Sequence, residues 1–387
     1  MNVLLVSPHF PPNHKYFVFA LRDAGANVFG VGESPAWEMP DDLRAAMVDY
    51  IYIPDMFNKP DDLHRAAEAI VHRHGPLHRI ESHNEHWLEH DARLREAFGV
   101  YGQKPADLLR NRRKLGMKDC FRDAGVPVAP AELIVSRQQA IAFANRVGFP
   151  LILKPDVGVG ASGATKVNDL KELEARLDPL PGDMVIEKFV KGRIVTYDGL
   201  ADRDGNVIFE SSLRYSANIM EIVQQRLVFH YHTLRDIPEE LLQDGRRSVK
   251  AFGIRERFFH FEFFELDNGD YYGLEVNVRP PGGFTMDMMN YSADVDLYTA
   301  WARLALYGEN IIPRYTRHNF VAHVGRRDGA HYTLKHDQIM HNLGIAFAHH
   351  PQMPRLWGPV MGEVVYLLGD PDLDKLKDAI SRVEAVS

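Results

Sequence analysis

The segment over residues 259–283 constrains the fold more than any other part of the chain. It reads as two strands separated by an Asp-Asn-Gly-Asp turn. Glu262 lies on the first strand, and Glu275, Asn277 and Arg279 occupy alternate positions of the second. Residues two apart on a strand project from one face, so these polar groups gather within an otherwise apolar and aromatic segment. Such oxygen ligands suit magnesium between nucleotide phosphates, and the arginine suits a transferring phosphoryl group.

Length and charge limit the classes of partner. A chain of 387 residues can form two or three packed domains. Its net charge of -8 argues against general attraction to nucleic acid or to an anionic membrane, so small-molecule partners are favoured. The single cysteine, Cys120, excludes an intramolecular disulfide. No membrane-length apolar run or signal-peptide pattern is present in the sequence, so we expect a cytoplasmic protein.

The first hundred residues alternate short apolar runs with helical patterns, which predicts a parallel sheet covered by helices. Strands are expected over 3–6, 28–31 and 50–53, and helices over 16–24 and 61–74. The turn after the first strand lacks the G-x-G-x-x-G spacing that brings backbone amides to a pyrophosphate. A dinucleotide is therefore not expected there.

A second group of signals follows residue 105. A basic run at 110–114 opens a helical pattern, and such runs are more often solvated faces than binding sites. The apolar strand at 151–154 ends in Lys154, whose burial is costly unless an anion meets it. A glycine-rich loop follows at once. Loops of this kind can cradle phosphate oxygens with backbone amides, although many are only tight turns.

Residues 184–192 allow two interpretations. The segment is a short apolar strand that ends in Glu187 and Lys188, with Phe189 and Val190 after it. It can be an ordinary edge strand whose charged pair solvates its end. Alternatively, it is a hinge between domains whose backbone groups bind the edge of a purine, with the aromatic and aliphatic side chains forming the slot.

Five segments, taken in order, resemble the ATP-grasp superfamily. They are the segment at Lys114, the strand ending at Lys154, the glycine loop, the 187–190 hinge and the 262–279 strand pair. The resemblance runs from the N-terminal strand to about Gly283. It implies an α/β and α+β fold, with an N-terminal Rossmann-like parallel-sheet domain and two α+β lobes that clamp ATP. The expected divisions are the N-terminal domain at 1–104, the first lobe at 105–182, the second lobe with the metal site at 183–310, and the completion of that lobe with a C-terminal lobe at 311–387.

The resemblance also implies roles for individual residues. Arg279 and Lys154 are the expected catalytic residues, because they would steady the phosphoryl group. A magnesium or manganese ion would be held by Glu262, Glu275 and Asn277. The expected ATP-binding residues are Lys114, Lys154, Gly158, Gly160, Ser162, Gly163, Glu187, Lys188, Phe189, Val190 and Asp198.

One position departs from the pattern of the superfamily. Many relatives place a glutamate two residues after the hinge glycine to hold the ribose hydroxyls, whereas this chain has Ile194. Asp198 faces the same way by strand parity and is the expected substitute.

Substrate contacts are expected outside the nucleotide motifs. The candidates are Arg214, His9, Gly282 and Gly283, although an arginine such as Arg214, Arg255 or Arg257 is more often a surface charge. His83, His86 and His90 have a spacing that can hold zinc, but the sequence is not H-E-x-x-H, and we expect them to flank the substrate site instead.

The expected reaction joins a carboxylic acid to an amine, such as that of an amino acid. ATP would convert the acid to an acyl phosphate with release of ADP, and the amine would then form the amide. The segment ending Asn277-Val-Arg279-Pro-Pro-Gly-Gly resembles the bacterial L-amino-acid ligases most. The alternatives are a carboxylase that activates bicarbonate, an enzyme that makes only an acyl or enol phosphate, and a non-catalytic nucleotide-binding protein. The sequence leaves a homodimer open.

Overall fold

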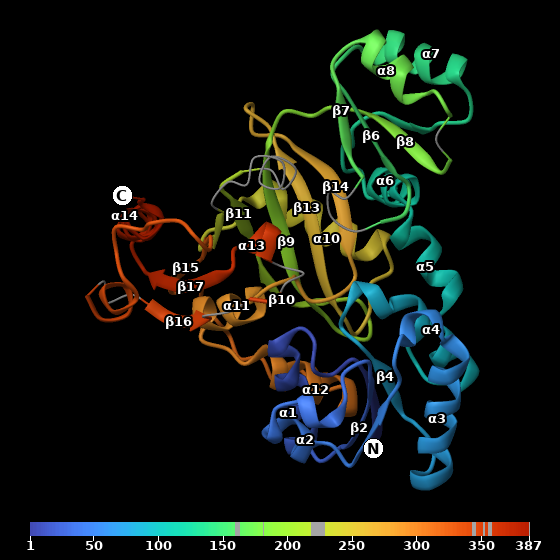
Figure 1. Ribbon diagram of the computed structural model, residues 1–387, viewed down its shortest axis with the longest axis vertical. Coiled ribbons are helices and arrows are strands. Elements are labelled where there is room, and N and C mark those ends of the chain that lie inside the picture. The colour runs from blue at the N-terminus through green and yellow to red at the C-terminus, as the bar shows by residue number, and fades with distance from the viewer. Residues whose placement is uncertain are drawn as a thin grey trace.

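The computed structural model describes residues 1–158, 163–180, 182–217, 229–342, 346–350, 353–354 and 358–386. Within them, three sheets with their helices form the body of the protein (Figure 1). The N-terminal sheet lies at the bottom of the view, the largest sheet fills the centre, and a small lobe projects at the top right. This arrangement confirms the predicted mixed α/β and α+β class. No helix in the described ranges is both long and apolar enough to cross a membrane.

The N-terminal sheet is parallel throughout, as predicted. Its strand order is β3-β2-β1-β4, and all five residues of β1 are buried because helices cover both faces. The strands are β1 (Asn2–Val6), β2 (Asn27–Gly32), β3 (Asp49–Tyr52) and β4 (Arg79–Glu81). The helices are α1 (Lys15–Asp23), α2 (Asp41–Ala46), α3 (Pro60–His74) and α4 (Leu88–Ala97), with short turns η1 (Pro12–His14), η2 (Ala36–Glu38), η3 (Met56–Asn58) and η4 (Glu85–Trp87). Carboxyl ends of parallel strands meet at one edge, so the loops after these strands lie together.

The first lobe is an antiparallel four-stranded sheet with the order β5-β8-β6-β7 among the described residues. Its strands are β5 (Ala131–Leu133), β6 (Leu151–Pro155), β7 (Thr165–Val167) and β8 (Met184–Lys188). Two helices, α7 (Arg137–Val147) and α8 (Leu170–Arg176), pack through Phe143, Ala144 and Leu173 against Leu151 and Leu153 of the sheet. Two further helices, α5 (Pro105–Arg112) and α6 (Lys114–Asp123), connect this lobe to the N-terminal domain.

The second lobe is built on a nine-stranded sheet, as far as the described residues show. Its strands are β9 (Arg193–Ala201), β10 (Val207–Ser211), β11 (Leu213–Tyr215), β12 (His230–Thr233), β13 (Phe258–Glu265), β14 (Tyr271–Asn277), β15 (Phe320–Arg326), β16 (Ala346–His350) and β17 (Val364–Asp370). Its helices are α10 (Glu239–Ala251), α11 (Thr285–Ala293), α12 (Leu297–Tyr307), α13 (Gly358–Met361) and α14 (Leu373–Glu384), together with the π-helical turn η5 (Gln338–Asn342). The C-terminal strands β15, β16 and β17 extend this sheet, so the last part of the chain completes the second lobe.

Two packing contacts position the site. Helix α6 lies so close to β14 that a Cβ added at Gly273 would stand 2.7 Å from the ring of Phe121, and this proximity brings the start of α6 to the polar end of β14. Helix α12 packs against α1, with Trp301 and Phe17 in one core cluster. The N-terminal domain is thereby joined to the second lobe around the edge where its strands end.

Candidate functional site

Two carboxylates face each other across β13 and β14. Glu262 is the register partner of Glu275, and Asn277 is the register partner of His260. Like charges directly opposite each other on a sheet destabilise it unless a cation is shared. Lys114, at the start of α6, supplies one cation, since its Nζ lies 2.6 Å from Glu275 Oε2. The structure therefore brings the three predicted metal ligands onto one face.

The lysine and the carboxylate in this pair are both buried. Lys114 is 5% exposed and Glu275 is 9% exposed. Burial disfavours the charged form of each, but the attraction between them outweighs it, so the pKa of Lys114 is raised and the pKa of Glu275 is lowered. Lys114 Nζ also lies 3.3 Å from the carbonyl oxygen of Gly158, at the start of the glycine loop. This lysine therefore connects the predicted metal site to the predicted phosphate loop.

A second buried ion cluster lies in the first lobe. Lys154 Nζ is 2.7 Å from Glu187 Oε2, and Lys118 Nζ is 3.1 Å from Glu187 Oε1. Burial lowers the pKa of Lys118 to about 8, against the opposing influence of Glu187. Lys118 was not predicted as a site residue, although it lies one helical turn after Lys114 on the same face of α6. The signal was available in the i, i+4 spacing of the two lysines.

The hinge residues are held against the first lobe. Lys188 Nζ donates to the carbonyl oxygens of Gly148 and Phe149 at 3.1 and 3.0 Å, and the backbone N–H of Phe189 donates to Pro150 at 3.2 Å. Lys166 Nζ lies 4.1 Å from the centre of the Phe189 ring, so a cation–π contact also holds this ring in place. Val190 is half-buried.

The glycine loop is described only in part. Gly158 begins it with an extended backbone, and Gly163 ends it with φ of +76°, a conformation that favours glycine. Two residues predicted to bind ATP, Gly160 and Ser162, lie outside the described residues.

Asp198 has a different environment from the one its ribose role requires. It is fully buried, its Oδ1 lies 2.5 Å from His260 Nδ1, and Thr196 donates its hydroxyl to Oδ2. Both oxygens therefore have protein partners, and the structure gives no support to a contact between Asp198 and a ribose. His260 also lies 3.3 Å from Glu262 Oε1. Burial alone would keep this imidazole neutral, but the two carboxylates raise its pKa to about 9.

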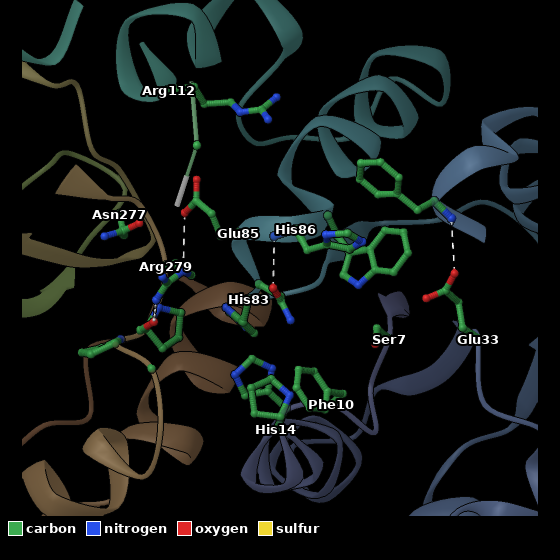
Figure 2. Close-up of a pocket in the computed structure, with 18 of the residues that line it drawn as sticks. Ser7, Phe10, His14, Glu33, His83, Glu85, His86, Arg112, Asn277 and Arg279 are labelled. Carbon is green, nitrogen blue, oxygen red and sulfur yellow. Dashed lines mark hydrogen bonds and ion pairs between the residues drawn. The ribbon is translucent and has the colours of Figure 1, made fainter. Parts of the chain in front are cut away.

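A cavity of about 770 Å³ opens between this face and the N-terminal domain. Figure 2 shows Arg279 and Asn277 on one side of it and Glu33 on the other. The lining residues come from the loops after β1, β2, β3 and β4, from the start of α6 and from the segment after β14. They are Ser7, His9, Phe10, Pro11, His14, Glu33, Ser34, Phe57, His83, Asn84, Glu85, His86, Trp87, Arg112, Lys114, Met117, Val157, Gly158, Asn277, Arg279, Pro280, Pro281 and Gly282.

Glu85 separates Arg279 from the middle of this cavity. Its Oε2 lies 3.4 Å from Arg279 Nε, and burial raises its pKa although Arg279 and other cations oppose the shift. Four histidines that line the cavity, His9, His14, His83 and His86, have pKa values lowered by burial, so their rings are neutral at pH 7. The N-terminal half of the cavity is thus mainly an aromatic and imidazole wall.

The substrate residues predicted from the sequence divide into two groups. His9 and Gly282 line the cavity. Gly283 lies just behind it, where its carbonyl oxygen accepts a hydrogen bond from Asn13 Nδ2 at 3.2 Å. Arg214 does not line the cavity. It is the register partner of Val195, which packs in the core on the other face of the sheet, and its guanidinium binds Glu265 at 2.8 Å. Its role is a structural ion pair.

The histidines that raised the question of zinc do not form a metal site. No group of three metal-binding His, Cys, Asp or Glu side chains occurs in the described part of the chain. His83 stacks on Phe17, His86 stacks on Phe57, and His90 binds the backbone of Phe57 at 3.0 Å. These rings are occupied with packing, and His83 and His86 line the cavity.

Comparison with known proteins identifies the class. Residues 113–280 match the family described as the ATP binding domain of the carbamoyl-phosphate synthase L chain. The structure is similar over its whole length to an L-amino acid ligase from Bacillus licheniformis, with a TM-score of 0.77, 16% identity and 98% of that chain covered. It is also similar to N5-carboxyaminoimidazole synthetase from Staphylococcus aureus, with a TM-score of 0.74, 14% identity, and 99% and 97% of the two chains covered. The chain therefore has the predicted ATP-grasp fold, and residues 113–280 are similar to an ATP-binding domain.

Two of the sequence relatives are enzymes of different kinds. An L-arginine-specific L-amino acid ligase from Bacillus subtilis is 24% identical over 277 residues, which cover 68% of this chain and 66% of the ligase. Pyruvate carboxylase 1 from Caenorhabditis elegans is 28% identical over 221 residues, which cover 53% of this chain and 18% of the carboxylase. The matches thus span less than two thirds of these relatives, and the chain resembles the ligase over more of its length.

Proposed function

We propose that this protein is an ATP-dependent ligase that joins a carboxylic acid to an amine, with amino acids as the substrate class. The γ-phosphoryl group of ATP is transferred to a carboxylate oxygen, which gives an acyl phosphate and ADP. The amine nitrogen then attacks the acyl carbon and loses a proton, while the carbon–oxygen bond to phosphate breaks. Similarity to the L-amino acid ligases supports this assignment.

The observation that carries the proposal is the position of the cavity. It begins at Lys114, Asn277 and Arg279, beside the paired carboxylates, and extends into the N-terminal domain. An acid bound there lies next to the place where phosphoryl transfer is expected. The cavity of about 770 Å³ is also much larger than bicarbonate requires, and it falls within the range of small-molecule sites.

The donor set fits the nucleotide and its metal. Glu262, Glu275 and Asn277 offer oxygen ligands on one face, which is the set that magnesium prefers, and the bound ion would neutralise phosphate charge. Lys114 and Lys154 would exchange their carboxylate partners for phosphate oxygens. The residues from Glu187 to Val190 would frame the adenine. Arg279 would hold the acid's carboxylate and the transferring phosphoryl group, and this requires it to leave Glu85.

The second candidate is a carboxylase, since a biotin carboxylase domain from Hydrogenobacter thermophilus has a TM-score of 0.70 at 16% identity and covers the whole chain. The two functions separate in one experiment. The protein is incubated with MgATP and pools of amino acids and small acids, with and without hydroxylamine, and the products are read by mass spectrometry. ADP together with an amide or a hydroxamate supports the ligase. ADP that appears only with bicarbonate assigns the protein to the carboxylases, and AMP with pyrophosphate excludes the acyl-phosphate route.

A further inference from the structure

The end of the cavity farthest from Arg279 is an aromatic wall. Phe57 comes from η3, while His86 and Trp87 come from η4. The rings of Phe57 and His86 are stacked, with centroids 4.2 Å apart and planes inclined by 27°, and Trp87 meets His86 edge-on at 4.6 Å. This wall is built from two separate loops of the N-terminal domain.

The turn that carries Phe57 is fixed in place. Met56 is fully buried, Asn58 Nδ2 donates to Asp55 Oδ1 at 2.7 Å, and His90 binds the carbonyl oxygen of Phe57 at 3.0 Å. Yet Phe57 itself is 43% exposed and lines the cavity. A large apolar ring held by a rigid turn against a cavity offers a ready-made face to a ligand, because little conformational entropy remains to be lost on binding.

Glu33 places a negative charge beside this wall. The backbone N–H of Phe57 donates to Glu33 Oε1 at 3.4 Å. No basic side chain of the described residues forms an ion pair with Glu33. The ring of His86 feels the charge of Glu33, but burial lowers the pKa of His86 below the ordinary value even though Glu33 opposes the shift, so the ring does not neutralise the charge.

The opposite end of the cavity carries the cations. Arg279, Lys114 and Arg112 all line it there, and each pairs with a glutamate: Arg279 with Glu85, Lys114 with Glu275, and Arg112 with Glu89. Figure 2 shows Arg279 and Glu33 at opposite sides of the view. The charges at the Arg279 end are therefore paired, whereas the carboxylate of Glu33 at the far end has no ion-pair partner among the described residues.

We propose that the far end of the cavity selects an acid substrate whose side chain ends in a cation, such as the ammonium of lysine or the guanidinium of arginine. This inference rests on the proposed ligase function and names its substrate class. Glu33 is the counter-ion, and the stacked pair of Phe57 and His86 covers the apolar stem and the face of the cation. The substrate's own carboxylate then points to Arg279, where activation takes place.

Matched ligands test the proposal directly. Lysine and norleucine differ by the terminal ammonium, and arginine and citrulline differ by the charge of the terminal group. Each is titrated into the protein by calorimetry in the presence of magnesium and a non-hydrolysable ATP analogue. We expect the cationic member of each pair to bind about fivefold more tightly, the upper range for an ion pair with an exposed carboxylate such as Glu33.

Two variants locate the effect. Glu33→Gln removes the charge with little change in volume and should abolish the preference. Glu38→Gln is the control, because Glu38 is an exposed acid of the same loop that does not line the cavity. It should keep the full preference.

The outcomes separate this inference from the function on which it rests. The selection of a cation would be overturned by equal binding of lysine and norleucine to the wild-type protein, or by a preference that survives Glu33→Gln. Turnover of neutral or aromatic acids would then leave the ligase assignment intact. Failure to release ADP with any acid would instead reject the ligase assignment. Loss of preference in both variants would show that the loop, rather than the charge of Glu33, is responsible.

Discussion

The nucleotide end of the site and the N-terminal-domain end of the cavity are prepared for ligands in different ways. In the ATP-binding lobes, two buried lysines and the partly buried Lys154 already face carboxylates: Lys114 faces Glu275, while Lys118 and Lys154 share Glu187. In the N-terminal domain, neutral imidazoles and aromatic rings form the wall, and Glu33 has no ion-pair partner in the described part of the chain.

The nucleotide end and the N-terminal-domain end of the site should therefore respond to different substitutions. Where charges are paired in the empty protein, a ligand binds by exchanging one ion pair for another, so the removal of one partner leaves a buried charge unbalanced. Where rings form the wall, a ligand binds mainly through shape complementarity. The removal of one ring therefore lowers the binding free energy only by the contacts that this ring makes. The predictions below test this contrast.

The largest expected effect is on the carboxylate pair. Glu275→Gln keeps the volume of the side chain but removes the charge that faces Lys114 and would hold the metal. We expect ATP turnover to fall by about a thousandfold or more, because the phosphate charge is no longer neutralised. ADP release at saturating magnesium measures the effect, with circular dichroism as the control for folding. Turnover at the wild-type rate would refute the assignment of the metal site.

Asp198→Ala should act on stability rather than on the nucleotide. The substitution removes the closest partner of buried His260, and breaking such a pair costs about 3 kcal/mol in the free energy of unfolding. The affinity for ATP without metal should stay unchanged, because both carboxylate oxygens of Asp198 already have protein partners, His260 and Thr196. Urea denaturation and equilibrium dialysis measure the two quantities. A large loss of ATP affinity with unchanged stability would restore the ribose role.

The same buried histidine predicts a pH dependence. The pKa of His260 is raised from 6.5 to about 9, so its contribution to stability is fully present below pH 6.5 and is lost as the pH rises through 9. Wild type should therefore lose on the order of 2–3 kcal/mol of stability over this range relative to His260→Gln. Parallel denaturation curves at pH 6, 7.5 and 9 in chelator provide the comparison. A constant difference between the two proteins would contradict the charged state of His260.

The smallest expected effect is at the aromatic wall. Phe57→Ala should raise the KM for the acid substrate by about tenfold, since it removes one face of the cavity and no charge. The KM for ATP should not change. Steady-state kinetics with each substrate varied in turn would show this, and Tyr52→Ala, at another exposed aromatic residue near β3, is a suitable control. An equal increase in both KM values would mean that the two ends are coupled.

Strand parity explains how much of the site could be predicted. Glu262, Glu275 and Asn277 were placed together because a face of a strand follows directly from alternation in the sequence. Strand alternation also placed Asp198 on that face. It could not show that His260, on the neighbouring strand, is the register partner of Asp198. Such facts depend on register between strands far apart in the chain.

Two further misses have the same origin. Arg214 lies on the opposite face because β11 pairs with β9 in a register that no local pattern gives. Glu85 meets Arg279 only when the N-terminal domain packs against the second lobe, so its place could not be seen from the sequence. Lys118 is different, because its spacing from Lys114 was sufficient to predict it.

Transfer of a carboxylate oxygen to phosphate tests the central claim most directly. The acid is labelled with ¹⁸O in its carboxylate, and the phosphate released during amide formation is examined by mass spectrometry. Activation through an acyl phosphate predicts one ¹⁸O atom in each phosphate, with ADP as the other product, because the bond that breaks in the second step lies between the acyl carbon and that oxygen. Phosphate without label, or label found in AMP, would contradict the account.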